Sequence, residues 1–100
     1  MRGVLIDAGP VFDPELPWQR SRSVALRPEP FGALVYSFST RKLSFLKSPT
    51  LVRVVQTLCD HPTAAAALAA CDVPDAQRPT YVKALADLAR SAMIEPRETP

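Results

Sequence analysis

GALVYSFSTRKLSFL, residues 32–46, carries the strongest secondary-structure signal in the chain. Its first half, residues 33–38, is rich in β-branched and aromatic side chains, which favour a strand. Residues 39–41 are polar and typical of a turn, and residues 42–46 have the alternating pattern of a further strand. The segment therefore predicts a β-hairpin.

A shorter strand is expected immediately before this hairpin, at residues 23–27. Val24 and Leu26 alternate there with small or charged residues. Pro28 and Pro30 then remove N–H groups that a longer ladder would need, so the strand should end before them. The three strands together predict a small antiparallel sheet.

Beyond the hairpin the apolar period lengthens to that of an α-helix. Ser48 is the expected N-cap of a first helix, with Pro49 at its first position, where a missing N–H costs nothing. Pro62 should stop this helix near Asp60. An alanine-rich second helix is expected at residues 63–71.

A third helix is expected between residues 75 and 92, with an apolar stripe that includes Leu85 and Leu88. The expected fold is therefore α+β and winged-helix-like, with a three-stranded antiparallel β-sheet followed by three α-helices (βββααα). Residues 1–22 show no periodic pattern and are expected to form an extended N-terminal arm, whose apolar residues pack on the domain. Residues 96–100 are expected to form a C-terminal tail.

Length and composition fit one compact domain. One hundred residues support a single core, and 47% apolar with 22% charged residues lies near the globular average. The longest apolar run, residues 64–71, is far below the ~20 residues of a membrane helix, and residues 4–6 are too short an apolar run for a secretory signal. A cytoplasmic protein is expected, with Cys59 and Cys71 reduced and packed in the core.

The chain lacks the side-chain combinations that enzymes need. Its single histidine, His61, stands beside Pro62 at an expected helix end, where it is a poor candidate for a catalytic base. One histidine with Cys59 and Cys71 cannot complete a four-ligand metal site. The three glycines form no phosphate-binding loop. We therefore expect no catalytic residue, metal or cofactor.

Positive charge is concentrated in one part of the chain. Residues 20–53 hold seven basic residues and one acidic residue, which gives this segment a formal charge of +6. The remaining residues sum to −4, so the overall net charge is +2. An acidic partner is one interpretation, and a solvated rim is the other. A winged-helix DNA-binding domain is the alternative function, but the expected third helix is close to neutral, which disfavours it. A structural subunit of a larger assembly is a third possibility.

The third strand looks like an exposed sheet edge next to a helix with a broad apolar face. An extended peptide could add there as a further strand and pair with the backbone of residues 43–46. Its side chains would then enter a groove against the last helix.

Two long motifs resemble the MftB family of peptide chaperones from the mycofactocin system. They are VALRPEPFGALVY at residues 24–36 and TRKLSFLK at residues 40–47, and the similarity extends over about residues 12–96. Proteins of this family are similar to the PqqD-like precursor recognition elements of ribosomal peptide modification. The resemblance assigns residues 23–95 to a PqqD-like peptide-recognition domain.

The resemblance implies an adaptor that makes no covalent change itself. Its partners would be a precursor peptide (MftA-like), whose leader it grips, and a radical SAM maturase (MftC-like), to which it presents the peptide. No nucleic-acid or membrane partner is implied. The peptide-binding residues carried over to this chain are Arg41, Lys42, Leu43, Ser44, Phe45, Leu46, Tyr81, Ala84, Leu85 and Leu88.

These residues are not expected to act alike. Alternating side chains cannot all face one groove, so Phe45 and Leu85 are the candidates for the core. Arg41 and Lys42 are expected to meet carboxylates of the leader. Apolar residues of the arm, Val11 and Phe12 among them, are a candidate cover for the groove in the absence of peptide.

Overall fold

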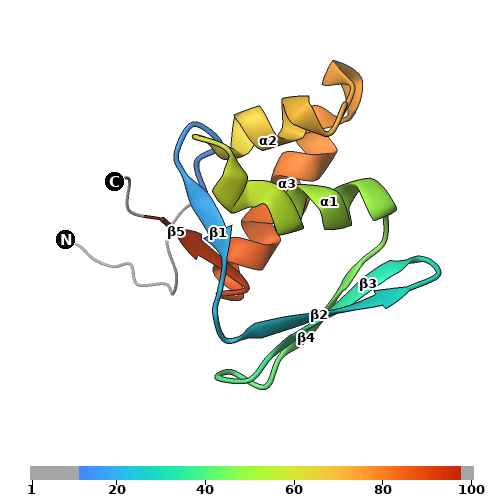
Figure 1. Cartoon of the computed structure of the whole chain (residues 1–100), viewed down its shortest axis with the longest axis vertical. Helices are drawn as coiled ribbons and strands as arrows, with labels where there is room; N and C mark the ends of the chain where they lie inside the picture. Colours follow the sequence, from blue (N-terminus) through green and yellow to red (C-terminus); the bar gives the residue numbers. More distant parts are fainter. Residues whose placement is uncertain (1–11, 98–100) are drawn as a thin grey trace.

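Three helices lie over one face of a three-stranded antiparallel sheet, and a second, two-stranded sheet joins the two ends of the described chain (Figure 1). The structure is a computed structural model, which describes residues 12–97. The elements in chain order are β1 (Trp18–Arg20), β2 (Val24–Glu29), β3 (Gly32–Ser37), β4 (Leu43–Leu46), α1 (Pro49–Thr57), α2 (Ala64–Ala70), α3 (Arg78–Arg90) and β5 (Ile94–Pro96). Short 3-10 turns, Leu58–Asp60 and Asp75–Gln77, follow α1 and precede α3.

The central sheet has the order β2-β3-β4, which confirms the expected hairpin and makes β4 an edge strand. Ala33 and Val35 of β3 and Leu46 of β4 are buried, and α1 packs across this side of the sheet. Their neighbours along each strand point to the opposite side, because successive side chains of a strand alternate between faces. The sheet therefore has one face covered by helices and one face turned away from them.

Strand β2 is longer than expected, because Pro28 lies inside it rather than ending it. Pro28 stands opposite Ala33, and β2 is an edge strand. The absent N–H therefore points toward the free edge, where it breaks no ladder bond. Gly32, the first residue of β3, has φ +152°, and a Cβ there would lie 2.0 Å from the carbonyl oxygen of Leu46. Only glycine permits this close approach.

Helix α1 begins as its sequence predicts, α2 begins one residue after its expected start, and α3 begins at Arg78, three residues after its expected start. The Ser48 side chain accepts a hydrogen bond from the Leu51 N–H at 3.2 Å and caps α1, with Pro49 in the first turn. The Thr63 side chain accepts from the Ala66 N–H at 3.0 Å and caps α2. These hydrogen bonds fix the residues at which α1 and α2 begin.

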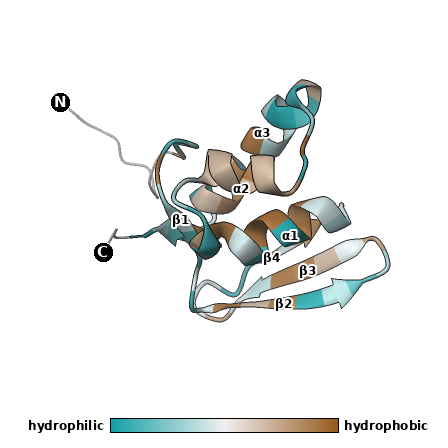
Figure 2. Cartoon of the chain, turned by 45° about the horizontal axis from the view of Figure 1, so that its top comes forward, coloured by the Kyte–Doolittle hydropathy of each residue, from teal (hydrophilic) through white to brown (hydrophobic). Residues whose placement is uncertain are grey.

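The core forms between the three helices and the covered face of the sheet. Val54, Leu58 and Leu85 are fully buried. Figure 2 shows that the alanine-rich helix α2 is apolar along its length. Cys71 is buried as expected. The expectation that Cys59 also packs in the core is wrong, because it lies in the 3-10 turn after α1 and faces solvent.

The second half of the expected arm belongs to the folded body. Residues 1–11 lie outside the described range, but β1 pairs antiparallel with β5, and Trp18 at its start is only 1% exposed. The Phe12 ring lies 4.9 Å from the Trp18 ring, and the carbonyl of Asp13 accepts from the Trp18 indole N–H. This confirms that apolar residues of the arm pack on the domain. It also places Phe12 against Trp18 and not over the expected groove.

The expected tail is likewise ordered at its start. Pro96 stands opposite Trp18 in the two-stranded sheet. The Arg97 guanidinium donates hydrogen bonds to the carbonyl oxygens of Trp18 at 3.0 Å, Leu58 at 2.9 Å and His61 at 2.7 Å. Described residues on both sides of the expected range 23–95 therefore make contacts with the helices and with each other.

Candidate functional site

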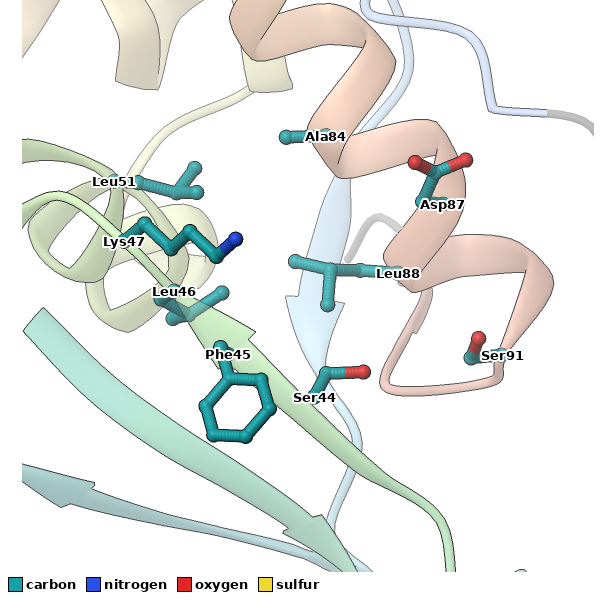
Figure 3. A pocket seen from close by; sticks show the side chains of 9 residues that line it. All are labelled: Ser44, Phe45, Leu46, Lys47, Leu51, Ala84, Asp87, Leu88 and Ser91. Atoms are coloured by element: carbon teal, nitrogen blue, oxygen red, sulfur yellow. The ribbon is translucent and has the colours of Figure 1, made fainter.

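A groove runs between β4 and α3 and consists of two adjoining cavities. The first, of about 260 Å³, is lined by Ser44, Phe45, Leu46, Lys47, Leu51, Ala84, Asp87, Leu88 and Ser91 (Figure 3). The second, of about 270 Å³, is lined by Phe45, Lys47, Ser48, Leu51, Thr80, Tyr81 and Ala84. Because the two cavities share Phe45, Lys47, Leu51 and Ala84, they form one continuous channel, called here the β4–α3 groove.

Helical spacing explains the wall that α3 contributes. Tyr81, Ala84, Leu88 and Ser91 are separated by three or four residues, so they stand on one side of the helix axis. Ala84 has the smallest of these side chains, and it is common to both cavities. At Ala84 the wall that α3 contributes to both cavities is therefore a single methyl group.

The start of α1 holds this end of the groove together. The hydroxyls of Ser48 and Tyr81 are 3.2 Å apart, which links the loop after β4 to the first turns of α3. Ser48 also caps α1 through Leu51, whose side chain lies on the floor of both cavities. One serine thus ties β4, α1 and α3 in a fixed relation.

Within residues 12–97, one edge of β4 has no partner strand, and it lies beside the groove. The Ser37 N–H donates to the Lys42 carbonyl at 2.9 Å, which fixes the phase of the β3–β4 ladder. Residues of an antiparallel strand direct their N–H and C=O groups alternately toward and away from the neighbouring strand. Ser44 and Leu46 therefore bond to β3, while the backbone groups of Leu43 and Phe45 point toward the open edge.

Six of the ten residues expected from the sequence line the groove. They are Ser44, Phe45, Leu46, Tyr81, Ala84 and Leu88. Leu85 is fully buried in the core, as expected. The expectation that Phe45 serves the core is wrong: its side chain is 55% exposed, because it alternates with the buried Leu46.

The remaining three expected residues lie at the start of β4, outside the groove lining. Leu43 is exposed on the face of the sheet turned away from the helices. Arg41 and Lys42 lie in the exposed turn before the strand, where Arg41 has φ 63°. The two basic residues flank one end of the β4 edge.

Sequence reasoning missed several lining residues. Lys47 lies in the connection between β4 and α1, Leu51 lies in the first turn of α1, and Asp87 and Ser91 extend the α3 face toward its end. The helical period starting from Tyr81 could have indicated Ser91. The positions of Lys47 and Leu51 depend on how α3 crosses the start of α1, and no sequence pattern reports that crossing.

The described residues, 12–97, show no grouping of three or more His, Cys, Asp or Glu side chains able to hold a metal ion. Within the same range, no helix has the length and apolar character needed to cross a bilayer. The groove itself offers mostly apolar lining side chains, and the adjacent edge of β4 offers backbone N–H and C=O groups.

Comparison with known proteins gives a consistent result. The model of the peptide chaperone MftB family matches residues 17–95. Peptide chaperone MftB of Mycolicibacterium smegmatis is 54% identical over 85% of this chain and 83% of its own length. The corresponding values are 46%, 98% and 97% for peptide chaperone MftB of Mycobacterium ulcerans, and 51%, 88% and 81% for that of Mycobacterium tuberculosis.

No solved structure gave a significant match. Peptide chaperone is a non-catalytic role, in agreement with the sequence-based conclusion that the chain is not an enzyme. With a family model that covers most of the chain and three relatives near half identity, the chain belongs to the peptide chaperone MftB family.

Proposed function

We propose that this chain is a peptide adaptor of mycofactocin biosynthesis. It binds the leader region of a ribosomally made precursor peptide (MftA-like) by strand addition to β4, and it presents that peptide to a radical SAM maturase (MftC-like). The observation that carries the proposal is a free strand edge directly beside an apolar groove. The same proposal includes a cytoplasmic location. It also includes kinship with winged-helix-like PqqD domains, which the order of three central strands followed by three helices supports.

The β4 edge supplies the main-chain part of the recognition. Leu43 and Phe45 each offer one N–H and one C=O to an incoming strand. Four such hydrogen bonds would contribute about 2 to 6 kcal/mol in net terms. Arg41 and Lys42, next to this edge, would attract acidic residues of the leader and raise its association rate.

The groove supplies the side-chain part. Alternate residues of the added strand would point toward α3 and contact Tyr81, Ala84 and Leu88, while Leu85 supports this wall from the core. Two buried apolar anchors would contribute about 3 to 6 kcal/mol. Since association and ordering cost roughly 4 to 15 kcal/mol, the expected affinity is moderate.

DNA binding by α3, the alternative function, has less support. Two basic side chains of this helix are engaged within the protein: Arg78 donates to the Ala65 carbonyl at 3.0 Å, and Arg90 pairs with Asp87. Arg78 is thereby held against α2 instead of being free to meet a phosphate. A recognition helix relies on free basic side chains to contact phosphates and base edges.

Isothermal titration with a synthetic leader peptide of the cognate precursor tests the proposal. We expect saturable one-to-one binding, and we expect Ala84→Phe to weaken it about tenfold or more, because a phenyl group fills the space that one anchor needs. Ala69→Phe, on the exposed side of α2, is the matched control and should bind as the parent protein does. Absence of binding by the parent protein would exclude the leader-carrying role, and unchanged binding by Ala84→Phe would exclude this groove.

A further inference from the structure

The face of the central sheet turned away from the helices is unusually apolar. The β2–β3–β4 register places Arg27, Leu34 and Phe45 in one cross-strand row. The neighbouring row consists of Ala25, Tyr36 and Leu43. Leu43 and Phe45 are 53% and 55% exposed, so a large part of this surface meets solvent.

Two further aromatic side chains enlarge the surface at its ends. Phe31, before β3, has its ring 6.1 Å from that of Phe45 and is 44% exposed. Phe38, after β3, has its ring 5.3 Å from that of Tyr36 and is 61% exposed. We call the surface formed by these two aromatic pairs with Leu34 and Leu43 the outer sheet face.

The fold does not account for this surface. The helices cover the other side of the sheet, and β3 carries apolar residues toward both sides (Figure 2). Monomeric proteins seldom leave large aromatic and aliphatic side chains contiguous on one face unless another molecule covers them. A contact with a second molecule would bury the four exposed side chains together.

Charge around the outer sheet face is basic. Lys47, which follows β4, lines both the groove and a shallow pocket beside Phe31 and Phe45, and Arg41 and Lys42 precede the strand. Arg27 lies on the β2 side, 3.1 Å from Glu29, which is the only acidic residue between positions 16 and 59. Two copies of this chain placed face to face would bring these basic rims together, so self-association is disfavoured, and a partner with carboxylates is favoured.

We propose that the outer sheet face docks a folded protein whose apolar patch is rimmed by carboxylates. We assign it to the maturase that receives the peptide, an assignment that rests on the proposed function. Ser44 and Leu46 lie on the groove side of β4, and Leu43 points outward, while Phe45 borders both surfaces because it lines the groove and also packs against Phe31. The leader and the enzyme can therefore occupy opposite sides of one strand at the same time.

Exposed aromatic residues with basic neighbours also occur on single-stranded nucleic-acid platforms. On this chain the rings pack edge-on against each other in two pairs, with Leu34 and Leu43 between them. Such an arrangement offers a mixed aliphatic and aromatic surface more than separate flat faces for bases to stack on. It favours a protein partner.

The test compares two titrations of the full chain, one with the purified cognate maturase and one with the synthetic leader peptide. The double variant Phe31→Glu with Phe38→Glu places like charge against an acidic partner and leaves the α3 wall intact. We expect it to weaken maturase binding about tenfold or more and to leave leader affinity within about twofold. Leu16→Glu is the matched control: Leu16 is 47% exposed and precedes β1, so both affinities should stay unchanged.

The outcomes separate the two proposals. Leader binding with unchanged maturase affinity in the double variant overturns the docking face and keeps the adaptor function, and so does a parent protein that binds leader but no maturase. Loss of maturase binding in the double variant, with no leader binding by the parent protein, keeps the docking face and overturns the adaptor function. Tight binding of a fluorescent oligothymidine that the double variant abolishes would overturn the protein partner in favour of nucleic acid.

Discussion

Arg97 joins three separate parts of the chain through one guanidinium group. It donates to carbonyl oxygens of Trp18 in β1, Leu58 after α1 and His61 before α2. Arg97→Ala would remove the donor from the partly buried carbonyls of Trp18 and His61, while the Leu58 carbonyl would keep its hydrogen bond from the His61 N–H at 3.3 Å. We expect the free energy of unfolding to fall by about 2 to 4 kcal/mol, measured by urea denaturation followed through Trp18 fluorescence.

Arg90→Ala is the control for this prediction. Arg90 pairs only with Asp87 at the surface, where both side chains are more than half exposed, so its loss should change stability by less than about 0.5 kcal/mol. Equal effects of the two substitutions would contradict the role given to Arg97. From the sequence, Arg97 was expected in the C-terminal tail. Its hydrogen bonds to carbonyl groups far away in the chain follow no local sequence pattern, so the sequence could not predict them.

At the scale of elements, strand β4 should show amide hydrogen-exchange rates that alternate from one residue to the next. The amides of Ser44 and Leu46 point toward β3, whereas those of Leu43 and Phe45 point to the open edge. Hydrogen exchange, followed by NMR, should therefore be slow at the first pair and fast at the second in the free protein. Leader peptide should slow exchange at Leu43 and Phe45 by about tenfold or more if it adds as a strand.

A leader that binds through side chains alone would give another pattern. Exchange at Leu43 and Phe45 would then remain fast in the complex, although the titration still showed saturable binding. Uniform slowing along β4 would indicate general stabilisation of the domain instead of strand addition. The alternation thus tests the geometry of binding separately from its affinity.

The elements differ in how far their sequences reveal them. The β3–β4 hairpin and the capped start of α1 follow from alternation, a polar turn and the Ser48-Pro49 pair. Strands β1 and β5 have three residues each, too few to show a period, and they form because residues about eighty positions apart meet. The end of β2 was predicted too early, because Pro28 was expected to stop the strand. Proline is excluded from a ladder only where the N–H that it lacks would face a neighbouring strand.

Considered as a whole, the molecule uses the two sides of β4 for different surfaces. The strand edge and the α3 stripe could be predicted from sequence, because each is a property of one element. The groove also needs Lys47, Leu51 and Asp87, which come together only through the packing of α3 across α1. The outer sheet face was not predicted, because it depends on the register between three strands.

The pairing of the two chain ends is the last feature to test at this scale. A chain ended after Arg97 keeps β5 and all hydrogen bonds of Arg97, so it should unfold at the same temperature as the full chain. A chain ended after Met93 loses Ile94, which is 1% exposed, and leaves Trp18 without its partner strand. It should lose on the order of 5 kcal/mol. That loss is comparable to the whole stability of a small domain, about 5 to 15 kcal/mol, so the shorter chain should be largely unfolded by circular dichroism. A cooperative unfolding transition of unchanged midpoint in the shorter chain would show instead that the three-helix core and central sheet suffice without the β1–β5 pair.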